Sequence, residues 1–215
     1  AYGLGAIIVA MLALMVLLTS VLTNGLSSFQ QTFITLPIEL TAERVDKKGN
    51  RDPAEMAKTT TIGYAPLLRD AIAVEVARQG IETGLSDKEL GELISKEAAA
   101  TVRDRVLANP DLVGQTVTFD LLASGRIDGF FKGRVTMESA ALDGNTSPEA
   151  LMVAQSLADA GVVDTKFNWG FFTNPDASVQ RPEAAGLGVA ILGSIYMMLV
   201  VLFLALPIGV ASSIY

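Results

Sequence analysis

The sequence predicts two transmembrane α-helices that flank a small α+β domain, and three observations support this fold class. The 16 Lys and Arg and the 23 Asp and Glu residues all fall between Glu39 and Glu183, so both ends of the 215-residue chain are uncharged. Each end contains an apolar run of roughly 20 residues, the length that a helix needs to cross a ~30 Å hydrocarbon layer. Between these runs, segments with the period of a strand or of a helix indicate about three strands and about four to five helices.

We expect three parts: a first transmembrane helix over residues 1–24, an extracytoplasmic α+β domain over residues 25–185, and a second transmembrane helix over residues 186–215. The apolar run of residues 4–22 is longer than the apolar part of a signal peptide and no basic segment precedes it, so we interpret it as a retained anchor. Two antiparallel spans return the chain to its starting side, and the whole middle then projects from one face of the membrane. Because the chain has no starting Met, we expect it to be a piece of a longer polypeptide.

Three segments have strand character. Alternating apolar and polar residues predict a first strand over residues 34–40 and a second over residues 117–121. Pro37 lies in the first of these and cannot donate to a ladder, which predicts an edge strand or a bulge. The segment of residues 162–173 is dense in β-branched and aromatic residues and predicts a third strand.

Helical spacing and capping residues predict about five helices in the domain. They begin near Asp52, Tyr64, Ser86, Lys96 and Ser147. The clearest start is a capping box, in which the side chains of Ser86 and Glu89 each accept a hydrogen bond from a backbone donor of the other residue. Asn24 and Gly25 are expected to end the first transmembrane helix.

Composition excludes several classes of function. The domain holds the entire net charge of −7, which argues against binding of nucleic acid and predicts that the domain stands clear of the lipid headgroups. The chain has no Cys and no His, which removes thiol nucleophiles, His general bases and the common zinc ligands. No phosphate-binding G-x-x-x-x-G-K-[ST] motif occurs. We therefore predict no catalytic residue, no cofactor and no metal.

Three basic residues, Arg126, Lys132 and Arg134, lie among or directly after the glycines of residues 125–133. Such a cluster can hold an anion where backbone N–H groups converge. The segment lacks the strand-to-helix context of a phosphate cradle, so we interpret it as a solvated turn.

The second apolar run has one small face and one bulky face. Gly186, Ala190 and Ser194 recur at every fourth residue, a pattern that permits the close approach of another helix and favours a multi-helix bundle. Pro207 and Gly209 lie near the end of the run, where they either kink the helix or end it.

Four aromatic residues, Phe167, Trp169, Phe171 and Phe172, fall on the predicted third strand, and Trp169 is the only Trp in the chain. An aromatic stripe can be a surface for a partner or ligand, but on a strand it more often belongs to a core. We expect these side chains to lie in the domain core, where their burial would be its largest apolar contribution.

These residues carry a resemblance to a known family. The Gly-rich start at residues 183–188, the G-S-I-Y segment of residues 193–196 and the P-I-G-V-A-S-S-I-Y run of residues 207–215 resemble the second transmembrane segment of bacterial phosphate ABC transporter permeases of the PstA type. Residues 24–32, 107–116, 122–124 and 167–173 are similar to the variant of that family with a large extracytoplasmic insertion between its first two spans.

The resemblance implies the N-terminal part of a membrane-spanning permease subunit of an ATP-driven phosphate importer, located in the bacterial inner membrane with residues 25–185 in the periplasm. The implied partners are a second permease subunit, ATPase subunits, a periplasmic phosphate-binding protein and the lipid bilayer. ATP hydrolysis would occur in the ATPase subunits, and the inserted domain would serve assembly or contact with the binding protein. The loop that engages the ATPase would lie after Tyr215.

The main alternative is a two-span receptor or sensor with an extracytoplasmic ligand-binding domain, because its layout is the same. A membrane-tethered enzyme is disfavoured by the missing Cys and His. The sequence that follows Tyr215 in the parent protein distinguishes the first two hypotheses. A receptor would continue into long heptad helices, whereas a permease would continue into further apolar spans.

Overall fold

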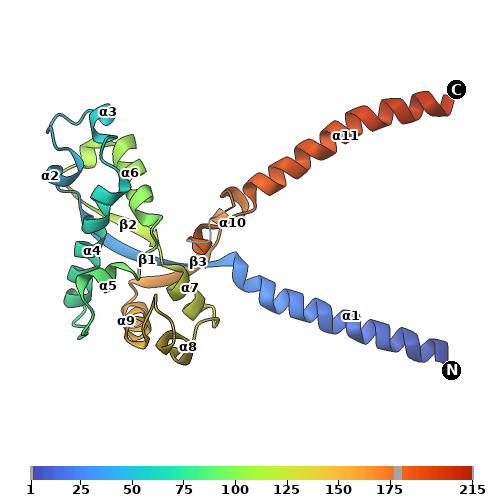
Figure 1. The fold of residues 1–215 in the computed structure, drawn as a ribbon, viewed down its shortest axis with the longest axis horizontal. Coiled ribbons are helices and arrows are strands. Elements are labelled where there is room, and N and C mark those ends of the chain that lie inside the picture. Colours follow the sequence, from blue (N-terminus) through green and yellow to red (C-terminus); the bar gives the residue numbers. More distant parts are fainter. Residues whose placement is uncertain (1, 177–180, 215) are drawn as a thin grey trace.

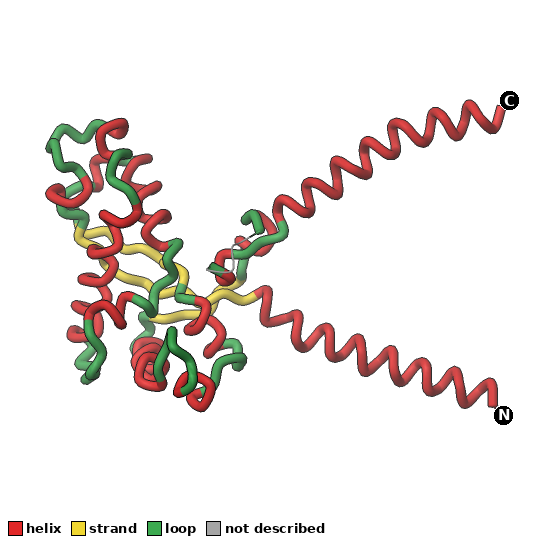
Figure 2. The backbone as a smooth tube through the Cα atoms, viewed as in Figure 1, coloured by secondary structure: helices red, strands yellow, loops and turns green. Residues whose placement is uncertain are grey.

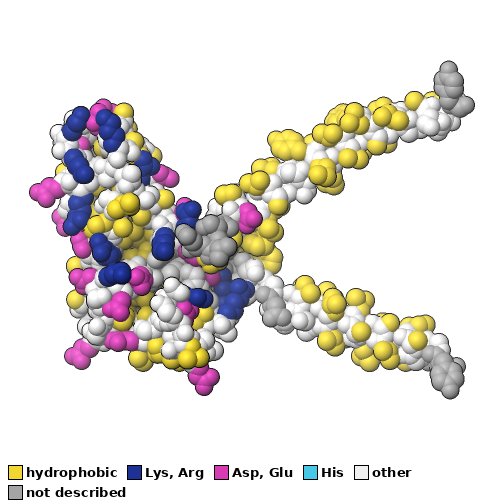
Figure 3. Space-filling view, in the orientation of Figure 1, with side chains coloured by type: hydrophobic (Ala, Val, Ile, Leu, Met, Phe, Trp, Pro, Cys, Tyr) yellow, Lys and Arg dark blue, Asp and Glu magenta, His cyan; other side chains and the backbone are white. Residues whose placement is uncertain are grey.

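A computed structural model describes residues 2–176 and 181–214. Its two longest helices are the apolar ends of the chain, α1 (Tyr2–Leu26) and α11 (Gly188–Ile214). Both leave the same end of a compact domain and diverge from there (Figure 1). By length and composition, each is able to cross a membrane. Hydrophobic side chains cover both helices, whereas the charged side chains gather on the domain (Figure 3).

Helix α1 ends after the predicted end at residue 24, whereas α11 begins after the predicted start at residue 186. Helix α1 continues through Asn24 and Gly25 to Leu26, and α11 continues through Pro207 to Ile214. Single Gly and Asn residues weaken a helix without forcing it to end, because each costs only about 1 kcal/mol relative to Ala. A proline removes one intrahelical hydrogen bond, which a long apolar helix tolerates.

The domain contains one antiparallel sheet with the strand order β2-β1-β3 (Figure 2). Strand β1 (Gln30–Glu39) pairs with β2 (Thr116–Leu122) along one side and with β3 (Val163–Phe167) along the other. The two strands predicted from alternating residues are confirmed.

Pro37 corrects the expectation of an edge strand, because β1 is central in the sheet. The backbone N–H of Thr35 donates to the carbonyl oxygen of Val162 on the β3 side of the strand. Because a strand repeats every two residues, the backbone nitrogen of Pro37 faces the same side. Strand β3, however, pairs only with residues 30–34 of β1. The missing N–H of Pro37 therefore falls where the strand is locally an edge, and no ladder hydrogen bond is lost.

Between α1 and α11, the described residues form nine α-helical segments, where the sequence predicts about five. They are α2 (Ala42–Val45), α3 (Pro53–Met56), α4 (Thr61–Arg78), α5 (Asp87–Gly91), α6 (Ala98–Ala108), α7 (Gly125–Phe131), α8 (Met137–Ala141), α9 (Pro148–Asp159) and α10 (Gly170–Thr173), with 3-10 turns η1 (Ser27–Phe29), η2 (Pro110–Leu112) and η3 (Pro182–Ala184). The unpredicted segments α2, α7, α8 and α10 have seven residues or fewer. Segments of two turns or fewer are too short to show a helical period.

One hydrophobic core joins the sheet to the helices. The apolar residues of β1, Ile34, Leu36 and Ile38, are buried together with Tyr64 and Ile72 of α4. Helix α4 packs on β1, α6 packs on β2, and α9 packs on β3. The predicted capping box is also present, because Ser86 accepts from the backbone of Glu89 and the Glu89 side chain accepts from the backbone of Ser86.

Candidate functional site

Five aromatic rings meet where the two long helices join the domain. Phe29 lies in η1, directly after α1, and its ring contacts Phe167 of β3 and both Phe171 and Phe172 of α10 at centroid distances of 5.4–6.4 Å. The indole of Trp169 packs edge-on against Phe167 at 4.9 Å. We call these five residues the aromatic cluster.

The expectation that these aromatic residues belong to the domain core is wrong. Trp169 is 72% exposed, Phe167 49% and Phe172 41%, and only Phe29 and Phe171 are half-buried. The reason is local: β3 ends at Phe167, the next two residues turn the chain out of the sheet, and α10 begins at Gly170. The aromatic residues are therefore a surface of the domain.

Asn168 makes this turn and connects it to the foot of α1. Its backbone N–H donates to the carbonyl oxygen of Phe29 at 2.8 Å. Its side-chain amide donates to the carbonyl of Ser28, and its side-chain oxygen accepts from the backbone N–H of Phe171 at 3.0 Å. A single Asn thus positions rings on both sides of the cluster. Sequence reasoning missed Asn168, although an Asn next to a strand end is a frequent turn signal.

Two glycines set the start of α11 against α10. A Cβ atom on Gly186 would lie 2.5 Å from the carbonyl oxygens of Gly170 and Asn174, and one on Gly188 would lie 2.5 Å from the carbonyl oxygen of Thr173. The backbone N–H of Leu187 donates to Phe171 at 2.7 Å, and that of Gly188 donates to Asn174 at 3.0 Å. These bonds satisfy carbonyl groups at the end of α10 that a helix terminus leaves without partners.

Gly186 therefore does not belong to the small face predicted for helix packing, because it precedes α11 and packs within its own chain. Ala190 and Ser194 are exposed on α11, where the Ser194 hydroxyl donates to the Ala190 carbonyl. Pro207 and Gly209 lie inside the helix. That a partner helix covers this face stays a prediction.

A polar hollow of about 460 Å³ opens beside the aromatic cluster, between η1, α7 and the segment before α11. Its residues include Gln31, Asp128, Lys132, Asn168 and Glu183. The side chains of Lys132 and Asp128 are 6% and 9% exposed, and their ion pair has an N–O distance of 2.5 Å. The other carboxylate oxygen of Asp128 accepts from the backbone N–H of Thr32 at 3.0 Å.

This arrangement corrects the interpretation of residues 125–133 as a solvated turn. Residues 125–131 form α7, which places Lys132 one helical turn after Asp128 and brings both near the start of β1. The two glycines of α7 hide its helical character from the sequence. Arg126 pairs with Asp143, and the Arg134 guanidinium donates to the Ser27 hydroxyl at 2.6 Å.

On the open face of the sheet, Lys166 of β3 donates to Asp120 of β2 at 2.8 Å. This hydrogen bond and a second one from Thr35 hold the pKa of the Asp120 carboxyl below its ordinary value. Within the part of the chain that the structure describes, no three carboxylates converge in a way that could hold a metal ion. The chemistry at this end of the domain is that of an aromatic surface, ion-paired Lys and Arg side chains and hydrogen bonds.

A family model described as "Domain of unknown function (DUF3333)" matches residues 1–141. The match spans more than half of the chain. The chain belongs to the DUF3333 family. No curated protein and no solved structure matches it.

The family match ends at the last residue of α8, whereas the folded domain continues. In this DUF3333 protein, β1 pairs with β3, so the sheet needs residues that follow the matched range. Four of the five rings of the aromatic cluster also lie after residue 141, and only Phe29 falls within the match.

Proposed function

We propose that this DUF3333 chain forms the N-terminal part of the membrane-spanning permease subunit of an ATP-driven phosphate importer. In this proposal α1 and α11 cross the bacterial inner membrane and the domain between them stands in the periplasm. A second permease subunit, ATPase subunits and a periplasmic phosphate-binding protein are the partners. The domain serves assembly or contact with the binding protein.

The observation that carries the proposal is that two uncharged helices leave the same end of one charged domain (Figures 1 and 3). At 1.5 Å per residue, α1 is about 38 Å long and α11 about 40 Å, and both lengths exceed a ~30 Å hydrocarbon layer. Phosphate is proposed as the substrate because residues 167–173 and 207–215 resemble phosphate permeases. The net charge of −7 opposes direct capture of phosphate by the domain, so delivery by a binding protein fits better.

The test of function is uptake of radiolabelled phosphate by cells in which the gene for the full-length protein is deleted. We expect loss of uptake at low phosphate, restored by the wild-type gene. Copurification of ATPase and permease subunits with the tagged full-length protein is the second measurement. Unchanged uptake together with no copurified ATPase would contradict the proposal.

A matched pair of variants tests the small face of α11 in the same full-length protein. Ala190→Leu places an isobutyl group on the small face and should weaken assembly by about 1–3 kcal/mol if another helix packs there. Val189→Leu, one position earlier, places the same isobutyl group on a different side of the helix and should assemble normally. Equal yields of complex from both variants would mean that the small face contacts lipid.

A receptor with an extracytoplasmic ligand-binding domain is the second candidate, and the polar hollow beside the aromatic cluster is the observation that favours it. Isothermal titration of the full-length protein with phosphate separates the two functions. Saturable binding that is lost in Arg126→Met, at a half-exposed side chain that lines the hollow, would favour a receptor.

A further inference from the structure

The exposed rings of Phe167, Trp169 and Phe172, here called the aromatic surface, cost free energy if water covers them. Each exposed aromatic side chain forgoes about 1.5–3 kcal/mol of burial free energy, and contiguous exposed apolar surface marks an interaction site. The rings contact one another, because Phe167 lies 4.9 Å from Trp169 and 6.3 Å from Phe172 between centroids. They form one patch that a single partner can cover.

The position of the patch indicates what covers it. Phe29 of the same cluster lies just after α1, and Phe171 accepts a hydrogen bond from Leu187, the residue before α11. Strand β3 and α10 lie at the point where the two long helices converge on the domain (Figure 1). The aromatic surface is therefore continuous with the domain ends of both apolar helices, at the level where a spanning helix leaves the hydrocarbon layer.

Two basic side chains lie near the patch. Arg134 is exposed and donates to Ser27, the first residue after α1, whereas Lys166, which precedes Phe167 on β3, pairs with Asp120. Lys and Arg at this level are attracted to lipid phosphates, and Trp is enriched there because its ring is apolar and its N–H remains able to hydrogen-bond.

We propose that the aromatic surface lies in the headgroup region of the lipid bilayer and fixes the depth at which the domain sits. The inference rests on the proposal that α1 and α11 span the membrane. It reverses the expectation, drawn from the net charge of −7, that the domain stands clear of the headgroups. Net charge averages over the whole domain, whereas contact with lipid depends on the few side chains at the junction.

The single Trp of the chain makes the test direct. The whole chain is reconstituted into phosphatidylcholine–phosphatidylglycerol vesicles, and Trp169 emission is measured with nitroxide probes on the lipid headgroup, with probes deep in the acyl chain, and with iodide in the water. We expect the headgroup probe to remove most of the emission, and the deep probe and iodide to remove little.

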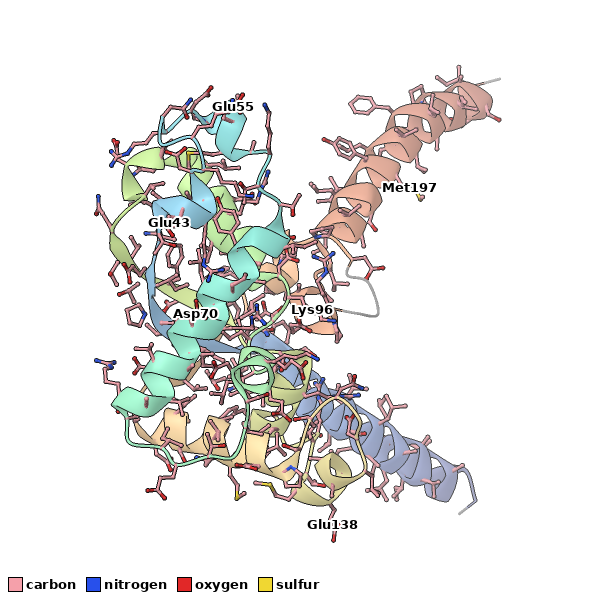
Figure 4. All side chains as sticks on the ribbon, turned by 60° about the vertical axis from the view of Figure 1, so that its left-hand side comes forward. Glu43, Glu55, Asp70, Lys96, Glu138 and Met197 are labelled. Carbon is pink, nitrogen blue, oxygen red and sulfur yellow. The ribbon has the colours of Figure 1, made fainter. Side chains whose placement is uncertain are left out.

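Two matched variants in a Trp169→Phe background calibrate the depth. Met197→Trp places the reporter on α11, where Met197 is exposed and lies clear of the domain (Figure 4). It should be quenched by the deep probe, which tests membrane spanning independently. Val74→Trp places the reporter at an exposed site on α4, and it should be quenched by iodide alone.

The outcomes separate the two proposals. If the deep probe quenches Met197→Trp but only iodide quenches Trp169, the helices span and the aromatic surface is in water, which overturns the inference. If neither lipid probes nor iodide reach Trp169, protein covers the patch, which also overturns it. If lipid probes fail to quench Met197→Trp, the spanning proposal itself fails.

Discussion

The backbone N–H of Asn168 donates to the carbonyl oxygen of Phe29 at 2.8 Å, which joins the turn after β3 to the foot of α1. The Asn168 side chain adds bonds to Ser28 and Phe171, from η1 and α10 respectively. Asn168 therefore connects the end of β3 to η1, which follows α1, and to α10, which precedes α11.

Replacement of Asn168 by Ala should therefore destabilise the junction. The variant keeps the backbone bond to Phe29 but leaves partly buried backbone groups without partners, which costs about 1–3 kcal/mol. Asn145→Ala, in an exposed loop, is the control and should cost little. The measurement is urea unfolding of the detergent-solubilised chain followed by circular dichroism, and equal midpoints for the two variants would contradict the assigned role.

Gly188→Ala should separate α11 from α10. The added Cβ would lie 2.5 Å from the backbone oxygen of Thr173, and a backbone atom cannot move aside as a side chain can. We expect a loss of about 1–3 kcal/mol and a lower thermal midpoint in detergent. Gly193→Ala provides the matched control, because apart from the adjoining backbone of its own helix nothing lies within 4 Å of its added Cβ. A thermal midpoint of Gly188→Ala as high as that of Gly193→Ala would show that the start of α11 is not closely packed against α10.

Trp169→Ala and Phe119→Ala should differ strongly in their effect on domain stability. Phe119 of β2 is 2% exposed, so its truncation should cost about 3–5 kcal/mol, whereas the largely exposed Trp169 should cost under about 1 kcal/mol. Urea unfolding measured by circular dichroism compares the two without relying on Trp emission. A loss of stability in Trp169→Ala as large as that in Phe119→Ala would mean that the indole is buried in the core.

The contrast between these two aromatic residues shows how far the sequence determines the fold. Phe119 alternates with polar neighbours, and period two alone predicts its strand and its buried face. Trp169 follows Phe167 with the same spacing, yet Asn168 bonds to η1 and turns the chain. That partner lies far away in the sequence, so no local pattern predicts the turn. The same holds for Asp128, whose partner Thr32 comes from β1.

Acid should weaken the domain through Glu75, a buried carboxylate of α4. Burial raises its pKa, but hydrogen bonds from Arg78 and Gln79 outweigh burial and leave the pKa below its ordinary value. Because the pKa is lower in the folded state, Glu75 stabilises the fold above its unfolded-state pKa, and this stability is lost as the pH falls through the folded-state pKa.

We therefore expect the unfolding free energy of the wild type to fall on acidification below about pH 4.5, and to fall less steeply in Glu75→Gln. Urea unfolding at a series of pH values measures both slopes. Glu138→Gln is the control for loss of one carboxylate, since Glu138 extends from the domain surface (Figure 4). If the unfolding free energy falls equally steeply with acidification in wild type and in Glu75→Gln, Glu75 does not contribute to the acid sensitivity of the domain.

The buried ion pair of Asp128 and Lys132 makes the largest single-residue effect that we predict outside the hydrophobic core. Lys132→Met keeps most of the side-chain volume but leaves the Asp128 carboxylate buried with only the N–H of Thr32 as a partner, which should cost about 3–5 kcal/mol. Lys88→Met, at an exposed site on α5, should be nearly neutral.

The double variant Asp128→Asn/Lys132→Met decides whether the cost comes from the unpaired charge. Asn retains an oxygen that can accept from Thr32 and carries no charge, so the double variant should be more stable than Lys132→Met alone. The two substitutions should couple with a free energy of about 0.5–3 kcal/mol. Urea unfolding of the wild type, of Asp128→Asn, of Lys132→Met and of the double variant gives that coupling. If the double variant is less stable than Lys132→Met, the lost Lys packing and not the buried charge explains the cost, and α7 is held to β1 by contacts other than this pair.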